Sequence, residues 1–552
     1  MMSKGFLIFR KQLPNWGQFI GLFVICAILV IGCNNEPNSV QPPTETAGAR
    51  ITIGTTLKPR TLDPADSYEL AGINIIYNVG ESLYTYELGT TKLKPLLATE
   101  MPTLSEDSLT YTIPLREGVS FHDGTLFNAE AMEFSLKRFM ENGGKPSFLL
   151  TDIVASVAAT GEYELTIKLK QPFSAFPALL AFPGACALSP AAYTLGVGEF
   201  NPNQLVGTGQ YKLTEFTADS IKLDVFAEYW GEKPANEGID LQIYAQNSAN
   251  LFNSFRTGAV DVAYQSLDPE QIKSLQAGAK EGKWQDIEAP GTVVSYLVLN
   301  LNQKPLDQLE VRQAIAALLD RNLLIERVLQ GQGEPVYSLI PTGFAMYKPA
   351  FQEVYGAVNI TKAKELLTQA GYSATNPIII EVWYPSGSTT RSIVAQTLKA
   401  LAAKELAGAI QFEPKSVEGA TAFSNVGKGI YPTFLADWYP DFLDADNYIQ
   451  PFLSCTQGSQ ITGCEAGGAQ TQGSFYYSDR MNQLIEQQRR EQNTETREAI
   501  FAEIQATLAQ DVPYLPLWQS KDYAFTQNGI SGLTINPQSI PFWQISRGNP
   551  PV

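Results

Sequence analysis

The stretch SLTYTIPLREGVSFHDGTLFNAEAMEFSLKR, residues 108–138, predicts a strand, a turn and a helix in direct succession. Apolar residues alternate along its first part, from Leu109 to Leu115, as they do in a half-buried strand. The segment FHDGT is typical of a turn, and we expect a helix to begin near Asn128. The chain's only histidine, His122, lies in this turn, where we expect it to be a hydrogen-bonded structural residue.

The apolar alternation of strands and the apolar spacing of helices both occur again elsewhere in the chain. Alternating apolar residues predict further strands at 165–169 and 221–225, and TVVSYLVLNLN (292–302) is apolar on both faces, which suits a central buried strand. Apolar residues at helical spacing predict helices within 311–329 and 496–509. The mixture of strands and helices indicates an α/β or α+β protein.

Length and charge narrow the class of protein. A chain of 552 residues exceeds the size at which one hydrophobic core stops growing, so we expect about three compact units. Aromatic residues make up 11% of the chain and can supply a pocket with large apolar surfaces. The 56 acidic residues outnumber the 39 basic ones, and the resulting net charge of −17 disfavours nucleic acid as a partner.

The N-terminus has the pattern of an export signal. Lys4, Arg10 and Lys11 precede FIGLFVICAILVIG (19–32), an uncharged apolar core. An uncleaved signal anchor is the alternative, because the uncharged run from 12 to 33 could just span a bilayer. Either arrangement places the folded part of the chain outside the cytoplasm.

The end of this apolar segment is similar to a bacterial lipobox. Val30, Ile31 and Gly32 precede Cys33, so we expect residues 1–33 to be a lipoprotein signal peptide and Cys33 to carry the lipid. Residues 34–49 contain almost no large apolar side chain, which predicts a disordered tether. The expected location is therefore the periplasmic or extracytoplasmic face of the membrane, with a lipid anchor.

Three cysteines remain after the signal segment. Cys455 and Cys464 lie close together in a Gly/Ser/Gln-rich loop, and in an oxidising compartment we expect them to form a disulfide. Their spacing fits no zinc pattern. Cys186 lies in an apolar segment and is expected to be a buried free thiol.

The sequence contains few signs of catalysis. It has no G-x-S-x-G elbow, P-loop, G-x-G-x-x-G, C-x-x-C or H-E-x-x-H motif. We therefore expect no catalytic residue, no cofactor and no metal site. A secreted hydrolase that uses two carboxylates stays open as an alternative, since it would need no histidine.

The segment FLADWYPDFLDADNYI (434–449) holds three closely spaced acids. It fails as a calcium loop, because neither starting position places the required glycine and glutamate. Asp444, Asp446 or Asn447 is expected to cap a helix near NYIQPFL. Asp441 follows an apolar strand-like run, where a partly desolvated carboxylate needs a cation. That cation could belong to a ligand or to a nearby Arg or Lys in a structural ion pair.

Five stretches together make the chain resemble the family 5 extracellular solute-binding proteins of ABC importers, which include the dipeptide- and oligopeptide-binding proteins. The resemblance covers roughly residues 50–545. It is carried by residues 108–138 and by TLDPADSYEL…YNVGESLYTY (61–86), VGTGQYKLTEF…AEYWGEKP (206–234), LNLNQKPLDQLEVRQAIAALLDR (299–321) and W-x-x-D-x-x-D in WYPDFLD (438–444).

The resemblance implies a type II periplasmic-binding-protein fold, in which a hinge joins two α/β lobes and an extra subdomain is added. Lobe I would be discontinuous and contain residues 50–80, 203–295 and 512–552. The extra subdomain would be residues 81–202, and lobe II residues 296–511. Such proteins have no catalytic activity; they close over a solute and deliver it to a permease with ATPase subunits. We expect a monomer.

The resemblance also implies a ligand site. In peptide-binding members the Asp of W-x-x-D binds the α-ammonium group of the peptide, and here that position is Asp441. Trp438 and Tyr439 would line the cleft nearby, although either could instead be a core residue. Tyr68, Glu69 and Leu70 follow Asp63-Pro64, in a loop that runs beside the ligand backbone in peptide binders.

One departure from the family pattern leaves the ligand open. Dipeptide binders use an arginine of lobe II for the ligand carboxylate, and the nearest candidate is Arg391, which equally suits the surface of a helix N-terminus. Di- or oligopeptides are thus the expected solutes. A metal chelate, an oligosaccharide or an opine-like compound is the alternative, and an extracytoplasmic chaperone or scaffold is a further one.

Overall fold

An 11-stranded mixed sheet runs through the computed structural model, which describes residues 49–245, 247–264 and 267–548. These residues belong to one compact unit, Thr46–Val552. β13 (Gly333–Pro335) pairs with β19 beside the main path of the sheet. Along that path the strands are β15 (Ile410–Val417), β14 (Ile378–Pro385), β16 (Thr433–Trp438), β12 (Trp284–Leu299), β19 (Tyr514–Gln527), β11 (Val262–Tyr264), β1 (Ile51–Thr55), β10 (Gly238–Ile243), β9 (Ser220–Val225) and β8 (Tyr211–Phe216).

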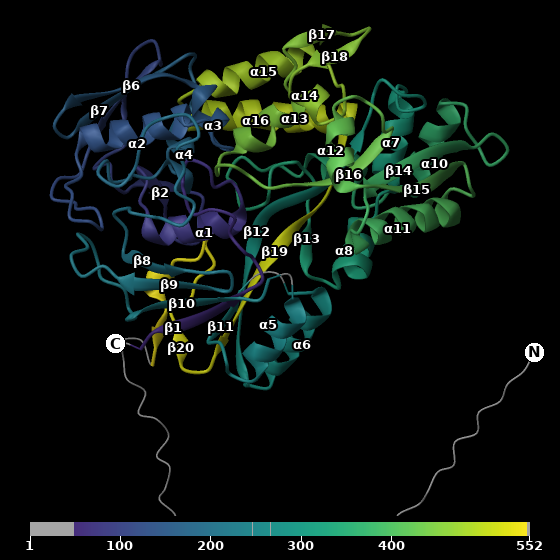
Figure 1. The fold of residues 1–552 in the computed structure, drawn as a ribbon. Helices are drawn as coiled ribbons and strands as arrows, with labels where there is room; N and C mark the ends of the chain where they lie inside the picture. The colour runs from purple at the N-terminus through teal and green to yellow at the C-terminus, as the bar shows by residue number, and fades with distance from the viewer. Residues whose placement is uncertain (1–48, 246, 265–266, 549–552) are drawn as a thin grey trace, which may run out of the picture. The chain divides into compact units, whose positions relative to one another are not determined.

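The long strands β12 and β19 connect the two halves of this sheet (Figure 1). β12 pairs antiparallel with β16 on one side and with β19 on the other, and its residues from Val294 to Leu299 are buried. The prediction of a central buried strand at 292–302 is therefore confirmed. The register of β12 against β19 shifts between Pro290 and Val294. Gly291 lies in this bulge, where a Cβ atom would come within 2.5 Å of the Ser520 hydroxyl oxygen.

Helices cover the sheet or pack beside it. The helical pattern at 311–329 is confirmed, and it is divided into two helices, because the Asp320 carboxylate accepts a 2.9 Å hydrogen bond from the backbone N–H of Leu323 and starts a new helix. The predicted helix at 496–509 is confirmed within α16. The longer helices are α1 (Leu70–Val79), α2 (Ala129–Glu141), α5 (Ser248–Arg256), α6 (Pro269–Lys280), α7 (Leu309–Leu318), α8 (Arg321–Leu329), α10 (Ile360–Gln369), α11 (Thr389–Glu405), α15 (Asp479–Arg490) and α16 (Thr494–Asp511).

The strand, turn and helix predicted for residues 108–138 are all present. β5 (Thr110–Pro114) pairs with β4 (Thr103–Leu104) and β7 (Glu164–Leu169), and β6 (Val154–Gly161) completes this sheet. The side chain of Asn128 caps α2 by accepting from the N–H of Ala131 at 2.9 Å. The Nε2 atom of His122 lies 2.9 Å from the backbone oxygen of Gly209, which is the hydrogen-bonded role expected for it.

The cysteines of the described region lie where the sequence analysis places them. Cys455 and Cys464 form a disulfide with Cα atoms 5.6 Å apart, beside β17 (Gln457–Ser459) and β18 (Gly463–Ala466). Cys186 is a buried free thiol, and burial raises its pKa to about 12. The predicted signal peptide, its lipid-bearing Cys33 and most of the tether lie outside the described residues. Within the described ranges, no helix combines the length and apolar character that a bilayer crossing requires.

Candidate functional site

A cavity of about 990 Å³ lies beside the central strands β12 and β19. This volume is at the upper end of the range typical for small-molecule sites. Residues from both predicted lobes and from the predicted extra subdomain line it. The charged residues among its lining are Glu69, Arg391, Asp437, Asp441, Lys521 and Asp522.

A buried ion pair fixes the loop that carries Tyr68, Glu69 and Leu70 to the cavity. Arg138 of α2 donates two 2.7 Å hydrogen bonds to the carboxylate of Asp63, and both side chains are fully buried. Glu69 accepts hydrogen bonds from the backbone N–H groups of neighbouring loop residues, so its carboxylate holds the loop in shape. Through Arg138, the segment 108–138 therefore helps to position the loop that contains Tyr68, Glu69 and Leu70.

Asp441 faces the cavity opposite that loop. The Tyr68 hydroxyl donates a short hydrogen bond to one oxygen of the Asp441 carboxylate, and the amide of Asn447 donates to the other at 3.5 Å. No Arg or Lys of the described residues lies within ion-pair distance of Asp441, so the structural ion pair considered from the sequence is absent there. Burial raises the pKa of Asp441, although both hydrogen bonds lower it.

The two later acids of the same segment have structural partners. Asp444 accepts 2.7 and 2.8 Å hydrogen bonds from Arg497 of α16, and it also caps the short helix η2 (Ala445–Tyr448) through the N–H of Asp446. Asp446 is buried beside Arg489 at 3.4 Å and accepts from Gln488. The expected capping role is confirmed for Asp444, while both ion pairs went unpredicted.

Arg391 lies in the cavity wall but is already paired. It is in the first turn of α11 and contacts the Asp437 carboxylate at 2.5 Å. The hydroxyl of Ser295 also donates to Asp437 at 2.5 Å. The guanidinium of Arg391 is thus held by an internal carboxylate, and its charge is largely compensated before any ligand enters.

The two aromatic residues predicted near Asp441 differ in position. Tyr439 lines the cavity and is 62% exposed. Trp438 is not part of the lining: its indole N–H donates to Asn447 at 3.2 Å, and its ring packs 5.0 Å from that of Phe452. Trp438 is therefore partly buried and packs against the core, as in the alternative that the sequence analysis kept, and the cleft-lining role expected for it has no support from this geometry.

Two cavity residues of β19 escaped the sequence analysis. Asp522 lines the cavity with no hydrogen-bond or ion-pair partner within the described residues, and burial raises its pKa to about 6. The hydroxyl of Ser520 is buried, lines the same cavity and likewise lacks a partner in the described part of the chain. The available signal was the polar group Ser520-Lys521-Asp522 inside an otherwise apolar strand.

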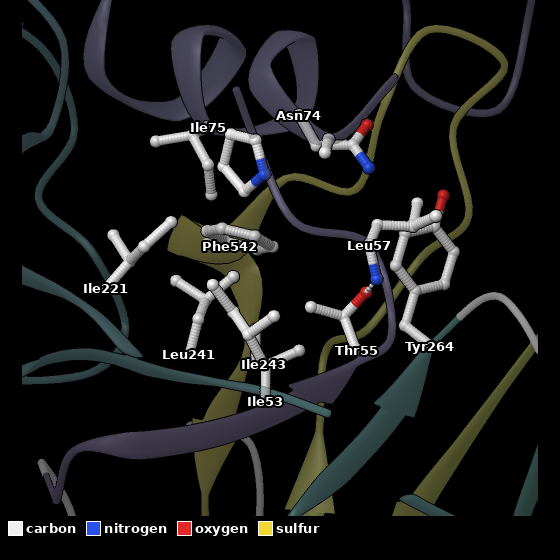
Figure 2. A pocket seen from close by; sticks show the side chains of 12 residues that line it. Ile53, Thr55, Leu57, Asn74, Ile75, Ile221, Leu241, Ile243, Tyr264 and Phe542 are labelled. Carbon is white, nitrogen blue, oxygen red and sulfur yellow. Dashed lines mark hydrogen bonds between the residues drawn. The ribbon is translucent and has the colours of Figure 1, made fainter. Parts of the chain in front are cut away.

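A second, much smaller cavity shares Leu57, Asn74 and Tyr264 with the lining of the large one, and Figure 2 shows the side chains around it. Its volume of about 20 Å³ could hold little more than one water molecule. Apolar side chains of β1, β9 and β10 surround it, and Phe542 closes one side. This cavity is a packing gap in the core, so the larger cavity is the candidate for solute binding.

The large cavity offers hydrogen-bonding groups and carboxylates rather than a metal centre. Among the described residues, no group of three or more His, Cys, Asp and Glu side chains is arranged to hold a metal ion. What the site can do chemically is to bind a polar, positively charged group at its carboxylates while its aromatic and aliphatic walls exclude water.

Comparisons with known proteins agree with this fold. A model of the bacterial extracellular solute-binding proteins, family 5 Middle, matches residues 92–460. The glutathione-binding protein GsiB of Escherichia coli O1:K1 is 28% identical over 490 residues, which are 87% of this chain and 90% of GsiB.

Solved structures extend the similarity to the whole described fold. DppA from Helicobacter pylori in complex with the peptide STSA superposes with a TM-score of 0.69 and 24% identity, covering 91% of this chain and 98% of DppA. NikA from Brucella suis in complex with Fe(III)-EDTA gives a TM-score of 0.77 and 22% identity, covering 90% of this chain and 99% of NikA. The periplasmic-binding-protein fold predicted from the sequence is confirmed.

Proposed function

Because the chain belongs to the family 5 bacterial extracellular solute-binding proteins, which serve ABC importers, we propose that it captures peptides by their α-ammonium group at Asp441 and delivers them to a permease. The observation that carries this proposal is the environment of Asp441. Its carboxylate lines a cavity of about 990 Å³, burial raises its pKa, and no cation of the described residues compensates it. A ligand ammonium would supply the missing positive charge.

The charges of the cavity favour a peptide over a metal–EDTA chelate, the ligand named for NikA. The chelate carries carboxylates and no free ammonium group, whereas glutathione, the ligand named for GsiB, is itself a tripeptide with an α-ammonium group. The two cations that line this cavity, Arg391 and Lys521, are already bound to acids of the protein. The chelate would therefore meet unpaired carboxylates without a free cation, which is unfavourable.

The remaining parts of the role follow from the family and from the N-terminal sequence. We propose a monomer that is tethered by lipid at Cys33 and has no enzymatic activity. Lobe I and lobe II, as predicted from the sequence, would close over the peptide about the central strands β12 and β19. The cognate permease and its ATPase subunits would be the protein partners.

Native mass spectrometry followed by calorimetry tests the proposal. A purified sample that retains ligand should show the added mass of peptides. Tetraalanine should bind, and either N-acetylation of the peptide or Asp441→Asn should weaken binding by about 10- to 100-fold. Because both changes remove the same contact, their effects should not add.

Asp286→Asn serves as the matched control. Asp286 of β12 has a pKa raised by burial but does not line the cavity, so its variant should bind tetraalanine as the wild type does. Equal affinity of the wild type for free and N-acetylated tetraalanine would contradict the ammonium contact. Failure to bind any peptide, together with an added mass of a sugar or a chelate, would reject peptides as the solute.

A further inference from the structure

The charge balance of the cavity leaves more than one acid without a cation among the described residues. Of its two cations, Arg391 is bound to Asp437 at 2.5 Å, and Lys521 to Glu288 at 2.9 Å. Among its acids, Glu69 is held by backbone N–H groups and Asp437 by Arg391. Glu69, Asp441 and Asp522 thus have no ion-pair partner among the described residues, and of these three only Glu69 is held by several backbone N–H groups.

Neighbours of Asp522 do not compensate its charge. Lys521 precedes it and also lines the cavity, but its ammonium group is bound to Glu288 at 2.9 Å. No positive charge lowers the pKa of Asp522, which burial alone raises. The carboxylate is thus ready to accept a cation from outside the protein.

The surroundings of Asp522 suit a cation in two further respects. Tyr439, the exposed aromatic residue that leads into Pro440-Asp441, lines the same cavity and interacts electrostatically with Asp437, Arg391 and Asp522. An aromatic face near a carboxylate favours an ammonium or guanidinium group. Asp522, Tyr439 and Asp441 all line the same cavity.

Ser520 provides an independent sign of a ligand. Its hydroxyl is buried and lacks a partner in the described residues, which is costly unless a bound molecule completes it. Ser520 precedes Asp522 by one alternation of the strand, so both side chains lie on the same side of β19. A ligand group with several N–H donors could satisfy the hydroxyl and the carboxylate together.

We infer that Asp522, with the hydroxyl of Ser520, is a second cation-binding point, and that the cleft selects peptides carrying a Lys or Arg side chain in addition to a free amino terminus. This inference rests on the proposed capture of peptides at Asp441. It assigns two positive charges of the ligand to two carboxylates of the cavity. It also accounts for the pairing of Arg391 with Asp437. Because the preferred ligand is recognised by its positively charged groups, the site does not need a free arginine.

A lysine scan of a small peptide tests the inference. Lysine is placed in turn at each of the four positions of tetraalanine, and every peptide is compared with its norleucine counterpart by calorimetry. In the wild type, lysine at one position or more should tighten binding by about 10- to 100-fold relative to norleucine. Asp522→Asn should remove that advantage while keeping the affinity for tetraalanine, and the control Asp286→Asn should leave the advantage intact.

The outcomes separate this inference from the proposed function. If tetraalanine binds but lysine brings no advantage at any position, or if the advantage survives in Asp522→Asn, the second cation-binding point is rejected and peptide capture stands. If none of the peptides binds, the proposed function fails and the inference fails with it. Ser520→Ala gives a second measure, since it should reduce the lysine advantage without affecting norleucine peptides.

Discussion

Asp441 and Asp444 lie in the same short loop, yet their surroundings shift the pKa values of the two carboxyl groups in opposite directions. Asp444 accepts two hydrogen bonds from Arg497, and although burial alone would raise its pKa, the charge and hydrogen bonds of this arginine lower it below 3.8. Asp441 meets only neutral donors from Tyr68 and Asn447, so burial raises its pKa. The charge of Asp444 is compensated by an arginine of the protein, whereas no cation of the described residues compensates the charge of Asp441.

The position of cations around each acid, rather than the local sequence, separates a structural carboxylate from a candidate ligand-binding carboxylate in this loop. A buried carboxylate with a bidentate arginine fixes the packing of α16 against η2. A carboxylate that faces a cavity without a cation costs stability and gains it back when a positively charged ligand binds. Substitutions that remove the partners of either acid test this contrast.

The largest change in the free energy of unfolding is expected for Arg497→Met, which removes the partner of Asp444. The substitution leaves Asp444 buried without its cation, which should lower the free energy of unfolding by about 3–5 kcal/mol. Urea unfolding followed by circular dichroism at pH 7 measures this change. A loss this large would show that Asp444 depends on its arginine, as Asp441 does not.

Arg480→Met is the matched control for this prediction. Arg480 of α15 pairs at 2.6 Å with Glu503 of α16, and both side chains are about half exposed, at 50% and 47%. Exposed pairs of this kind contribute less than about 1 kcal/mol. If Arg497→Met cost no more than Arg480→Met, the proposed contrast between Asp444 and Asp441 would be lost.

Whether the sequence predicts the role of each acid depends on how far apart in the chain the acid and its partner lie. Capping by Asp444 was predictable, because a cap and its helix are neighbours in the chain. The partner Arg497 was not, because only the packing of α16 brings it to the loop. The local pattern marked Asp441 as an acid that needs a cation, and the family resemblance assigned that cation to the α-ammonium group of a peptide.

The fold shows the same division between local and distant information. The strand, turn and helix of 108–138 were predicted from periodicity, and Asp320 offered a capping signal that would have divided 311–329 into two helices. Asp522 and Ser520 were missed, because alternation along β19 does not reveal which side of the strand faces a cavity. Trp438 was placed near the ligand by its motif, but its contact with Phe452 puts it in the core.

Asp522→Asn should have the next largest effect, and its sign is opposite to that of Arg497→Met. Burial raises the pKa of Asp522 from 3.8 to about 6 in the folded protein, so the folded state binds more protons between about pH 4 and pH 6. The unfolding free energy of the wild type therefore falls as the pH rises through this window. The variant should be more stable than the wild type at pH 7, by up to about 3 kcal/mol, and the difference should vanish below pH 4.

Asp444→Asn provides the comparison of sign in the same unfolding series. The pKa of Asp444 is lowered in the folded protein, so its stabilising contribution is present above about pH 4 and is lost only as the pH falls further. This variant should be less stable than the wild type at every pH from 4 to 7. A destabilised Asp522→Asn at pH 7 would show that Asp522 has an internal partner.

The smallest effect is expected for Tyr68→Phe, which removes one donor from Asp441 and leaves its cavity otherwise unchanged. Since that hydrogen bond lowers the pKa of Asp441 against the effect of burial, the pKa should rise further in the variant, and the unfolding free energy at pH 7 should fall by about 1 kcal/mol. Titration of the carboxyl ¹³C signal of Asp441 measures the first change, and urea unfolding the second. In the control Tyr477→Phe, which removes an exposed 2.7 Å bond to Asp479, both quantities should stay as they are in the wild type. An Asp441 titration that is the same with and without the Tyr68 hydroxyl would mean that this tyrosine does not hold the carboxylate, and the loop at residues 61–69 would then lose its direct link to the proposed ammonium site.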